Sequence, residues 1–342
     1  MKKQGCISVF IFYLNSLVAF LLLLSFILPY LPPSKFPSIS VLSLAVAPLI
    51  LVNIGFVLYW IMLFRKQFLL SLSVLILTTI NFASFIKFGK TPLTVVDDNT
   101  IRIASHNVRL FNQYETKEKR EETPGIFEEY LNEIQPDILF IQEFYDNKRI
   151  NFQDLTHKYI AYNDSKNIFG HAIYSRFPII DAGSFDFEQS SNNALWADIQ
   201  INNDTVRVYN VHLQSMRITA SVAYLQETGA DVIKNKISDA FVKQENQLKK
   251  LQAHFQEAPT RKKIIGGDFN NTPFSYTYKK LQEGMNDAFL KKGRGLGSTF
   301  YFDGFPLRID YLLVSPEIEV KQFTTKEDTF SDHYPVWADV KL

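Results

Sequence analysis

The first ninety residues contain no aspartate or glutamate, and this absence constrains the fold more than any other feature of the chain. They contain seven lysines and arginines and three long apolar runs, at 7–31, 36–64 and 68–86. A helix needs roughly 20 apolar residues to cross the hydrocarbon core of a bilayer, and each run has about that length. We therefore expect residues 1–90 to form a membrane domain with three transmembrane helices.

A cleaved signal peptide, or a set of buried helices in a soluble domain, would also contain long apolar runs. The first run follows Lys2 and Lys3, as in a signal peptide, but it is too long. The segment Leu31-Pro32-Pro33-Ser34 also lacks the small residues of a cleavage site. A soluble domain is not expected to run for ninety residues without an acidic side chain. Cys6 is the only cysteine, so the chain has no disulfide scaffold.

Basic residues beside the runs predict how the membrane domain is oriented, because cytoplasmic loops are enriched in lysine and arginine. Lys2 and Lys3 place the N-terminus in the cytoplasm, and Arg65 and Lys66 place the loop after the second run there too. With three crossings, the rest of the chain lies outside the cytoplasm, on the periplasmic side of the inner membrane if the source is bacterial. If 68–86 does not cross, the rest of the chain is cytoplasmic.

The remaining 252 residues have a different composition, which predicts a separate domain. They hold 29 basic and 35 acidic residues, a formal net charge of −6. After a polar linker at 91–99, strand-like runs such as 101–105 alternate with helix-like runs such as 124–134. This alternation predicts a mixed α/β domain over 100–342. The long helix-like stretch 220–255 is either a packing helix or a lid near the membrane.

Polar residues gather at the ends of the expected strands. Active sites of layered α/β proteins lie at such ends, because rigid strands hold the side chains of the adjoining loops. Carboxylate and amide oxygens suit Mg²⁺ or Mn²⁺, and a histidine paired with an aspartate acts as an oriented acid or base. The pattern therefore predicts a hydrolytic site with a hard metal ion. The residues concerned are Asn107, Glu143, His212, Asp268, Asn270, Asp310, Asp332 and His333.

Seven short motifs contain most of these residues and occur in a recognisable order. They are Ser105-His106-Asn107-Val108-Arg109, Ile141-Gln142-Glu143, Gly170-His171-Ala172-Ile173-Tyr174-Ser175-Arg176, Asn210-Val211-His212-Leu213, Gly266-Gly267-Asp268-Phe269-Asn270, Arg308-Ile309-Asp310-Tyr311 and Ser331-Asp332-His333-Tyr334-Pro335-Val336.

Together, over about residues 100–342, these motifs resemble the endonuclease/exonuclease/phosphatase superfamily, here in a membrane-anchored, bacterial-type form. These are metal-dependent phosphoesterases that include DNase I-like nucleases, neutral sphingomyelinases and inositol-phosphate 5-phosphatases. The resemblance implies a four-layer α/β/β/α sandwich of two mixed sheets, with the site at one edge.

The resemblance also implies where a metal ion binds and which residues act as acid or base. Glu143 and Asn107 would hold the divalent ion, Mg²⁺ or Mn²⁺, and Asp332 would support either the ion or the base. Asp310 would orient His333. His333 would then act as general base or as a charge-stabilising partner of the scissile phosphate.

The remaining matches would act on water and substrate. Asp268 and Asn270 would position the attacking water, and His212 would donate to a phosphate oxygen. Arg109 and His171 stand where other residues are usual in much of the family. We treat Arg109 and His171 as candidate substrate-binding residues.

Three functions remain open at this stage. The first is a membrane-tethered phosphodiesterase or phosphomonoesterase acting on a lipid headgroup or another phosphoester near the bilayer. The second is a membrane-tethered endonuclease or exonuclease. DNA binding depends on lysine and arginine, so the net charge of −6 on the α/β domain counts against a nuclease. The third is a non-catalytic scaffold that keeps the fold. We would expect such a scaffold to have lost Glu143, Asp268 or His333. All three are present. We expect a hydrolase whose partners are a phosphoester and the lipid bilayer, with no obligate protein partner.

Overall fold

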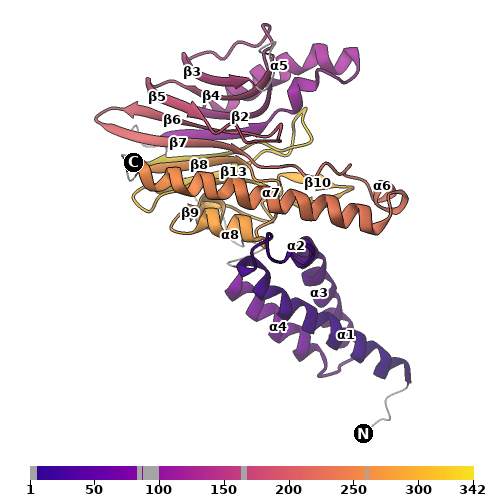
Figure 1. Ribbon diagram of the computed structural model, residues 1–342. Coiled ribbons are helices and arrows are strands. Elements are labelled where there is room, and N and C mark those ends of the chain that lie inside the picture. Colours follow the sequence, from indigo (N-terminus) through magenta and orange to yellow (C-terminus); the bar gives the residue numbers. More distant parts are fainter. Residues whose placement is uncertain (1–5, 83–86, 88–99, 163–167, 259, 261) are drawn as a thin grey trace.

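The computed structural model describes residues 6–82, 87, 100–162, 168–258, 260 and 262–342. It has two parts, an N-terminal bundle of helices and a larger α/β domain (Figure 1). The N-terminus lies at the end of the bundle that is far from the α/β domain. The helical bundle and the α/β domain thus follow the division in composition near residue 90.

The bundle consists of three long helices that pack against one another, together with short helical segments that join the first two. These elements are α1 (Cys6–Leu24), η1 (Ser25–Tyr30), α2 (Pro37–Ser40), η2 (Val41–Ala45), α3 (Val46–Met62) and α4 (Phe68–Asn81). In Figure 1, α1 runs toward the α/β domain, α3 runs away from it, and α4 returns.

Within the part of the chain that the structure describes, two helical stretches are long and apolar enough to cross a membrane, Cys6–Tyr30 and Pro37–Met62. They match the first two expected spans closely and are candidate membrane spans. The helix α4 has 14 residues, about 21 Å at 1.5 Å per residue, whereas the hydrocarbon core is about 30 Å thick. The expected third span also included 83–86, which lies outside the described residues, so a third crossing stays a prediction.

A buried polar network connects α1, α3 and α4. Asn15 Nδ2 donates to Ser71 Oγ at 2.5 Å, and Ser71 Oγ donates to Asn53 Oδ1 at 2.8 Å. Trp60 Nε1 donates to Asn15 Oδ1 at 2.8 Å. All four residues are buried among apolar side chains. Polar groups in such surroundings cost free energy unless they are paired, so the network fixes which faces of the three helices meet.

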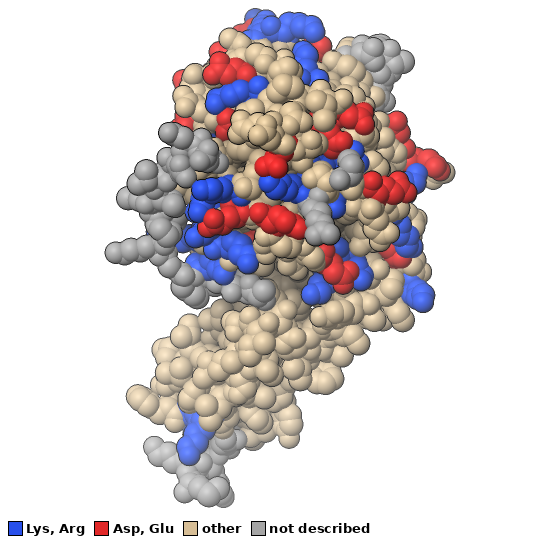
Figure 2. All heavy atoms as spheres, turned by 90° about the vertical axis from the view of Figure 1, so that its left-hand side faces the viewer, with Lys and Arg blue, Asp and Glu red and all other residues tan. Residues whose placement is uncertain are grey.

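The outer faces of the bundle are apolar. Among the described residues, twenty-five large apolar side chains of the bundle are exposed, against five in the α/β domain. In Figure 2 the bundle is almost entirely free of charge, whereas both signs of charge are mixed over the α/β domain. Apolar surface of this extent marks a membrane or protein contact, which agrees with membrane anchoring.

The α/β domain contains two six-stranded mixed sheets and a separate hairpin. The first sheet has the order β13 (Glu319–Thr325), β14 (Val336–Lys341), β1 (Ile101–Asn107), β2 (Ile138–Tyr145), β4 (Phe169–Ser175), β3 (His157–Tyr162). The second has the order β5 (Ile179–Ser184), β6 (Ala194–Ile201), β7 (Asp204–His212), β8 (Lys263–Asp268), β12 (Asp310–Val314), β9 (Asn286–Asp287). The hairpin consists of β10 (Phe300–Phe302) and β11 (Phe305–Leu307).

The two sheets pack face to face, and helices cover their outer faces. Along β2, Ile138 and Phe140 point into the core between the sheets, whereas Leu139 and Ile141 point outward to α5 (Lys117–Ile134). This alternation is the period-two pattern of a strand buried on both faces. The long α7 (Ala230–Glu257) and α8 (Tyr276–Gln282) cover the second sheet. The expected α/β/β/α sandwich is confirmed (Figure 1).

The stretch expected to be helical at 220–255 forms α6 (Val222–Glu227) and α7. Leu248 and Leu251, in the second half of α7, pack on the second sheet. The first turns of α7 are exposed or half-buried and stand beyond the edge of the sheet. Two further short helices, η3 (Arg109–Asn112) and α9 (Ala288–Lys292), follow β1 and β9.

The bundle and the α/β domain are joined by specific contacts. The backbone N–H and the hydroxyl of Ser34 both donate to the carboxylate of Glu245, at 2.7 and 2.9 Å. Glu245 lies on α7 and is buried. Phe82, after α4, packs edge-on against Phe274 with ring centroids 4.9 Å apart. These contacts join the segment before α2 to α7, and the end of α4 to the loop between β8 and α8.

Candidate active site

Strand register brings three of the expected catalytic residues side by side. β7 and β8 are parallel and pair His212 with Asp268, while β8 and β12 are antiparallel and pair Asp310 with Asp268. Asp268 therefore lies at the end of the central strand of three, between a histidine and a second aspartate. The three motifs that contain His212, Asp268 and Asp310 lie side by side because β7, β8 and β12 have these residues at neighbouring strand ends.

The turn after β8 depends on glycine and asparagine. Gly267 has a φ of +136°, and a Cβ there would lie 1.9 Å from the Val211 carbonyl oxygen, so only glycine fits. Asn270 has a φ of +49°, a conformation that asparagine tolerates better than most residues. Its backbone N–H donates to Asp268 Oδ1 at 2.7 Å, and its Nδ2 donates to the Leu213 carbonyl at 3.0 Å. The turn thus fixes Asn270 against Asp268.

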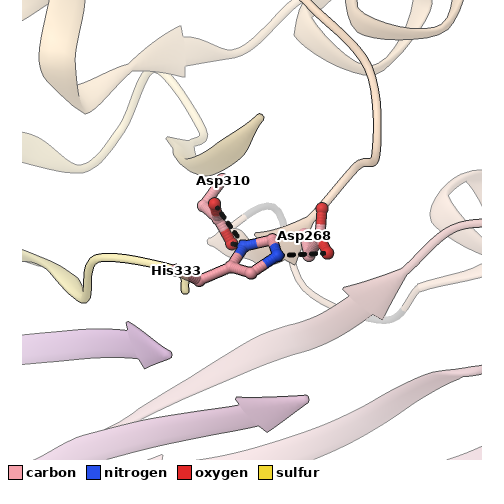
Figure 3. Close-up of side chains that lie close together, drawn as sticks. All are labelled: Asp268, Asp310 and His333. Atoms are coloured by element: carbon pink, nitrogen blue, oxygen red, sulfur yellow. Dashed lines mark hydrogen bonds and ion pairs between the residues drawn. The ribbon is translucent and has the colours of Figure 1, made fainter. Parts of the chain in front are cut away.

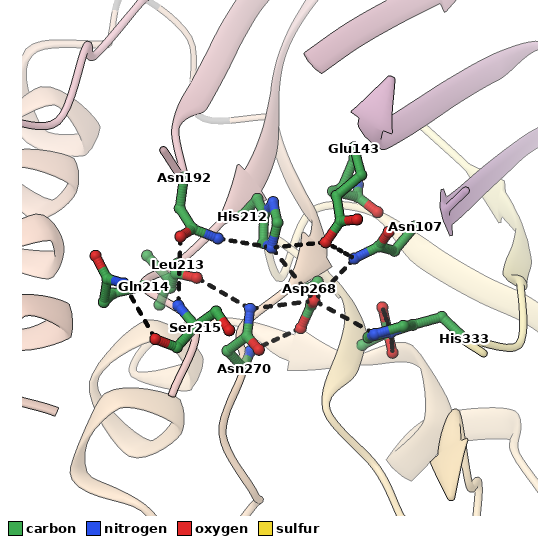
Figure 4. Close-up of polar contacts among 12 residues, drawn as sticks. Asn107, Glu143, Asn192, His212, Leu213, Gln214, Ser215, Asp268, Asn270 and His333 are labelled. Carbon is green, nitrogen blue, oxygen red and sulfur yellow. Dashed lines mark hydrogen bonds and ion pairs between the residues drawn. The ribbon is translucent and has the colours of Figure 1, made fainter. Parts of the chain in front are cut away.

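Glu143 reaches the same place from the first sheet. The β2–β4 register shifts between Ile141 and Phe144, and Glu143 has a φ of +49°. Such a bulge redirects a side chain away from the regular pleat. Asn107, at the end of β1, donates from Nδ2 to Glu143 Oε1 at 3.3 Å and to Asp268 Oδ2 at 3.2 Å. The Asn107 amide therefore donates to two carboxylates, Glu143 and Asp268, that come from different sheets (Figure 4).

His333 and Asp310 form an oriented pair (Figure 3). His333 Nδ1 lies 3.0 and 3.2 Å from the two carboxylate oxygens of Asp310, and its Nε2 lies 3.8 Å from Asp268 Oδ2. Burial lowers the pKa of His333, but Asp310 and Asp268 outweigh this effect and raise it to about 10. The two aspartates thus favour the imidazolium form, with Nε2 facing Asp268.

Two carboxyl groups of the site hold their protons more tightly than exposed carboxyl groups do, chiefly because they are buried. Burial raises the pKa of Asp268 to about 7, and Asp310 adds to this shift while His333 opposes it. Burial also raises the pKa of Glu143, against the lowering effects of His333 and Asn107. Burial disfavours the ionised forms, and a divalent cation bound beside these carboxylates would favour them.

His212 lies behind Asp268 as a neutral imidazole. Burial holds its pKa well below the usual value. Its Nε2 is 2.7 Å from Asn192 Nδ2 and 3.5 Å from Asp268 Oδ2. In this arrangement Nε2 accepts a hydrogen bond from Asn192. The implied role of donor to a phosphate oxygen requires Asn192 to release that nitrogen.

The two candidate substrate-binding residues occupy different places. His171 is buried on β4 and packs edge-on against His212, with ring centroids 5.2 Å apart, and it does not line the cavity described below. Arg109 lies at the rim, with its side chain 44% exposed, between Glu115 at 2.8 Å and Asp332 at 3.8 Å. The structure thus puts Arg109 near the site entrance and His171 behind the site.

Two sets of side chains fit a divalent cation. Asp268, Asp310 and His333 offer ligand atoms within 4.8 Å of one another, but Asp310 is already engaged by His333 Nδ1. Glu143 and Asp332 are more open, with side chains 37% and 48% exposed, and both line the cavity. Of the expected ligand set, Glu143 and Asp332 are therefore accessible from the cavity, whereas Asn107 is buried behind them.

Asn107, however, turns Nδ2 toward the carboxylates, because its Oδ1 accepts the Arg109 backbone N–H at 3.1 Å. Ligation through the Asn107 oxygen requires the amide to rotate. The carboxylate oxygens of Glu143 suit Mg²⁺ or Mn²⁺ without any such change.

The catalytic groups open into a cavity of about 490 Å³. One end of it is lined by Glu143, His212, Asp268, Asn270, Asp332 and His333. Eight of the ten residues expected from the sequence thus converge at one end of the two packed sheets, and six of these line one cavity.

Comparison with known protein families agrees with this geometry. A family model described as "Endonuclease/Exonuclease/phosphatase family" matches residues 104–333, more than half of the chain. The chain belongs to this family. A second model, described as a domain of unknown function, matches residues 8–85, the helical bundle. No curated protein matches the chain.

Solved structures of family members share the fold. A mannosyl-6-phosphatase from Bacteroides thetaiotaomicron is 18% identical, with a TM-score of 0.53, and the match covers 71% of this chain and 100% of that one. A family protein of the same organism is 18% identical, with a TM-score of 0.52, covering 70% and 97%. A humanized TDP2 from D. rerio is 15% identical, with a TM-score of 0.51, covering 72% and 100%. At these identities the likeness concerns the fold.

Sequence analysis missed three residues that support the site. Asn192 contacts His212 from the loop before β6. Thr299 Oγ1 accepts the Asp310 backbone N–H at 3.1 Å, and Ser331 Oγ donates to the Asn107 carbonyl at 2.7 Å while accepting the His333 N–H. Ser331 stood in a recognised motif, but nothing in the sequence pattern separates Asn192 or Thr299 from ordinary loop residues.

Proposed function

We propose that the protein is a membrane-anchored, divalent-metal-dependent hydrolase of a phosphodiester or phosphomonoester. The observation that carries the proposal is the convergence of Glu143, Asp268 and the Asp310–His333 pair on one end of a single cavity. Carboxylates around a cation site, beside an oriented imidazole, are the groups that hydrolysis of a phosphoester needs.

The chain's own residues divide the work of an in-line displacement. Asp268, held by the Asn270 N–H, accepts a proton from the attacking water and orients it, as its raised pKa of about 7 allows. The water oxygen bonds to phosphorus, and the leaving oxygen departs with the electron pair of the broken bond and takes up the proton of His333 Nε2. The His333 imidazolium places positive charge, and a proton at Nε2, beside the phosphate oxygens. When bound at Glu143, Mg²⁺ or Mn²⁺ would neutralise charge on the phosphate oxygens.

The lining of the cavity argues against a nuclease. Nucleic-acid binding rests on several lysines and arginines that neutralise successive phosphates. Among the described residues that line the cavity, Arg217 is the only lysine or arginine. A site with one such cation suits a substrate with a single phosphate group better than a polyanion.

Hydrolysis by the purified full-length protein in detergent tests the proposal. We expect hydrolysis of at least one class in a panel of p-nitrophenyl phosphate, bis(p-nitrophenyl) phosphate, phospholipid vesicles and duplex DNA. Activity should require Mg²⁺ or Mn²⁺ and disappear with chelator. A folded, metal-loaded protein that cleaves none of these esters contradicts the proposal, and cleavage of DNA alone would establish the nuclease.

We also propose that the α/β domain lies outside the cytoplasm, on the periplasmic side in a bacterium. The support is the basic loop at Arg65 and Lys66, at the end of the bundle away from the α/β domain. A reporter active only outside the cytoplasm, fused after Leu342, should be active. The same reporter fused after Lys66 should be silent. An inactive reporter at Leu342 would mean that α4 does not cross the membrane.

A further inference from the structure

The cavity is much larger than a phosphate group and changes character along its length. Its volume of about 490 Å³ lies within the roughly 300–1,000 Å³ of small-molecule sites. Away from the catalytic end, most of the lining side chains are apolar. Besides Met216, Ile218 and Ala220 in the loop after β7, and Ile309 before β12, they come from three parts of the chain: α6 with α7, the β10–β11 hairpin, and the helical bundle.

The first wall is the α6–α7 corner. Leu225, Ile233 and Ile237 line the cavity, and Leu225 and Ile233 are only half-buried. These side chains leave apolar surface facing the empty space. Covering that surface with an apolar ligand removes it from water, which is favourable.

The second wall is the β10–β11 hairpin, which connects the catalytic end to α6. Phe300, on this wall, packs at a tilt against the His333 ring, with ring centroids 5.0 Å apart. Phe302 and Phe305 extend the apolar lining away from the catalytic groups. At the tip, Asp303 accepts the backbone N–H that begins α6, at 3.0 Å.

The third wall belongs to the helical bundle. Leu44 and Pro48 line the cavity, four residues apart and thus on one face where η2 continues into α3. Leu51 and Val52, one turn further along α3, are 45% and 46% exposed. Apolar surface therefore continues from the cavity to the outer face of a candidate membrane span. Figure 1 shows α6 and the start of α7 standing above α3.

We propose that this cavity holds the long apolar chain of an amphiphilic phosphoester drawn from the bilayer, with its phosphate at the catalytic end. This inference rests on the proposed function and names its substrate class. A single such molecule accounts for both ends of the cavity: acidic, imidazole and amide groups at one end, and apolar side chains leading to α3 at the other. The Ser34–Glu245 hydrogen bonds hold the bundle wall in place.

Chain-length dependence of hydrolysis tests the inference. The substrates are methyl, hexyl and dodecyl phosphate and the corresponding p-nitrophenyl diesters, in mixed micelles of one composition with the full-length protein. In the series that the enzyme cleaves, each methylene that enters the cavity should raise kcat/KM about two- to fourfold until the cavity is full. Equal kcat/KM for methyl and dodecyl esters overturns the inference while the proposed function stands. Hydrolysis of no ester at all contradicts the proposed function itself.

A matched pair of variants distinguishes binding of the alkyl chain in the cavity from partitioning of the ester into the micelle. Ile233→Asn alters the wall, whereas Val232→Asn alters the neighbouring side chain, which is 52% exposed and does not line the cavity. We expect Ile233→Asn to lower the dodecyl-to-methyl ratio of kcat/KM about tenfold and Val232→Asn to leave it unchanged. Partitioning of the esters into micelles is the same for both proteins. An equal effect of the two substitutions overturns the inference.

Cross-linking uses the unaltered protein, so a folding defect of a variant cannot account for its result. The probe is a dodecyl phosphonate, which is not hydrolysed, with a diazirine at the end of the chain. Labelled peptides are expected to contain Leu44–Pro48 or the α6–α7 corner, and excess dodecyl phosphate should suppress the labelling. Labelling confined to the outer faces of α1 and α4 would show that the chain remains in the micelle, against the inference.

Discussion

Replacing His333 with alanine is expected to lower kcat by about 10²- to 10⁴-fold, the range of lost general acid–base catalysis. Nδ1 of this ring is fixed by Asp310 at 3.0 Å, and Nε2 faces Asp268 at the catalytic end of the cavity. Alanine can neither transfer a proton nor place positive charge beside the phosphate oxygens. Initial rates at saturating Mg²⁺, over a range of substrate concentrations, measure the effect on kcat separately from that on KM.

His157→Ala is the matched control for this substitution. His157 is exposed on β3, the edge strand of the first sheet, and takes no part in the described contacts of the site. Its kcat should equal that of the unaltered protein. Thermal unfolding of both variants shows whether each is folded. A folded His333→Ala protein with full kcat would remove His333 from the mechanism, whatever the fold.

The same prediction extends to pH, and its sign follows from the contacts of His333. Asp310 and Asp268 overcome the effect of burial and raise the pKa of His333 to about 10. If the imidazolium is the active form, activity falls as pH rises through about 10. Asp310→Asn removes one of the charges that raise this pKa, so the fall should move to lower pH. A general-base role predicts the opposite, namely activity that increases as His333 loses its proton.

The cluster of catalytic side chains could be predicted from the sequence because it depends on strand ends. His212, Asp268 and Asp310 each stand at the end of a short apolar run, and the register places them on adjacent strands. The number of layers could not be predicted in this way. Ile138 and Leu139 are both apolar although they face different layers, since β2 is covered on both sides. The four-layer arrangement came from the family resemblance.

The apolar part of the cavity could not be predicted, because no local pattern encodes it. Leu44, Ile233 and Phe302 meet around it from segments far apart in the chain. Leucine, isoleucine and phenylalanine are equally common in membrane helices, in protein cores and in strands, so the residue types do not indicate a cavity. Asn192 stands in a run of small polar residues typical of a turn, and only the fold brings it to His212. His171 lay in a family motif, but the register of β4 places its ring behind the site.

Glu143→Gln is expected to raise the Mg²⁺ concentration needed for half-maximal activity by about 10- to 100-fold, as loss of groups that tune a metal site does. The amide keeps the shape of the side chain, but it removes the charge that attracts a hard cation at the open side of the site. Chelator should abolish the activity of the unaltered protein. Titration of Mg²⁺ against initial rate measures the shift. The rise in unfolding temperature with added Mg²⁺ reports binding independently of turnover.

Two further variants decide which side chains hold the ion. Glu129→Gln, on the exposed face of α5, is the matched control and should leave the Mg²⁺ requirement unchanged. Asp310→Asn should lower kcat with little change in that requirement, because Asp310 is engaged by His333 Nδ1. If Asp310→Asn instead raises the requirement while Glu143→Gln does not, the ion lies among Asp268, Asp310 and His333. His333 would then be a metal ligand, and the imidazolium step proposed above would be wrong.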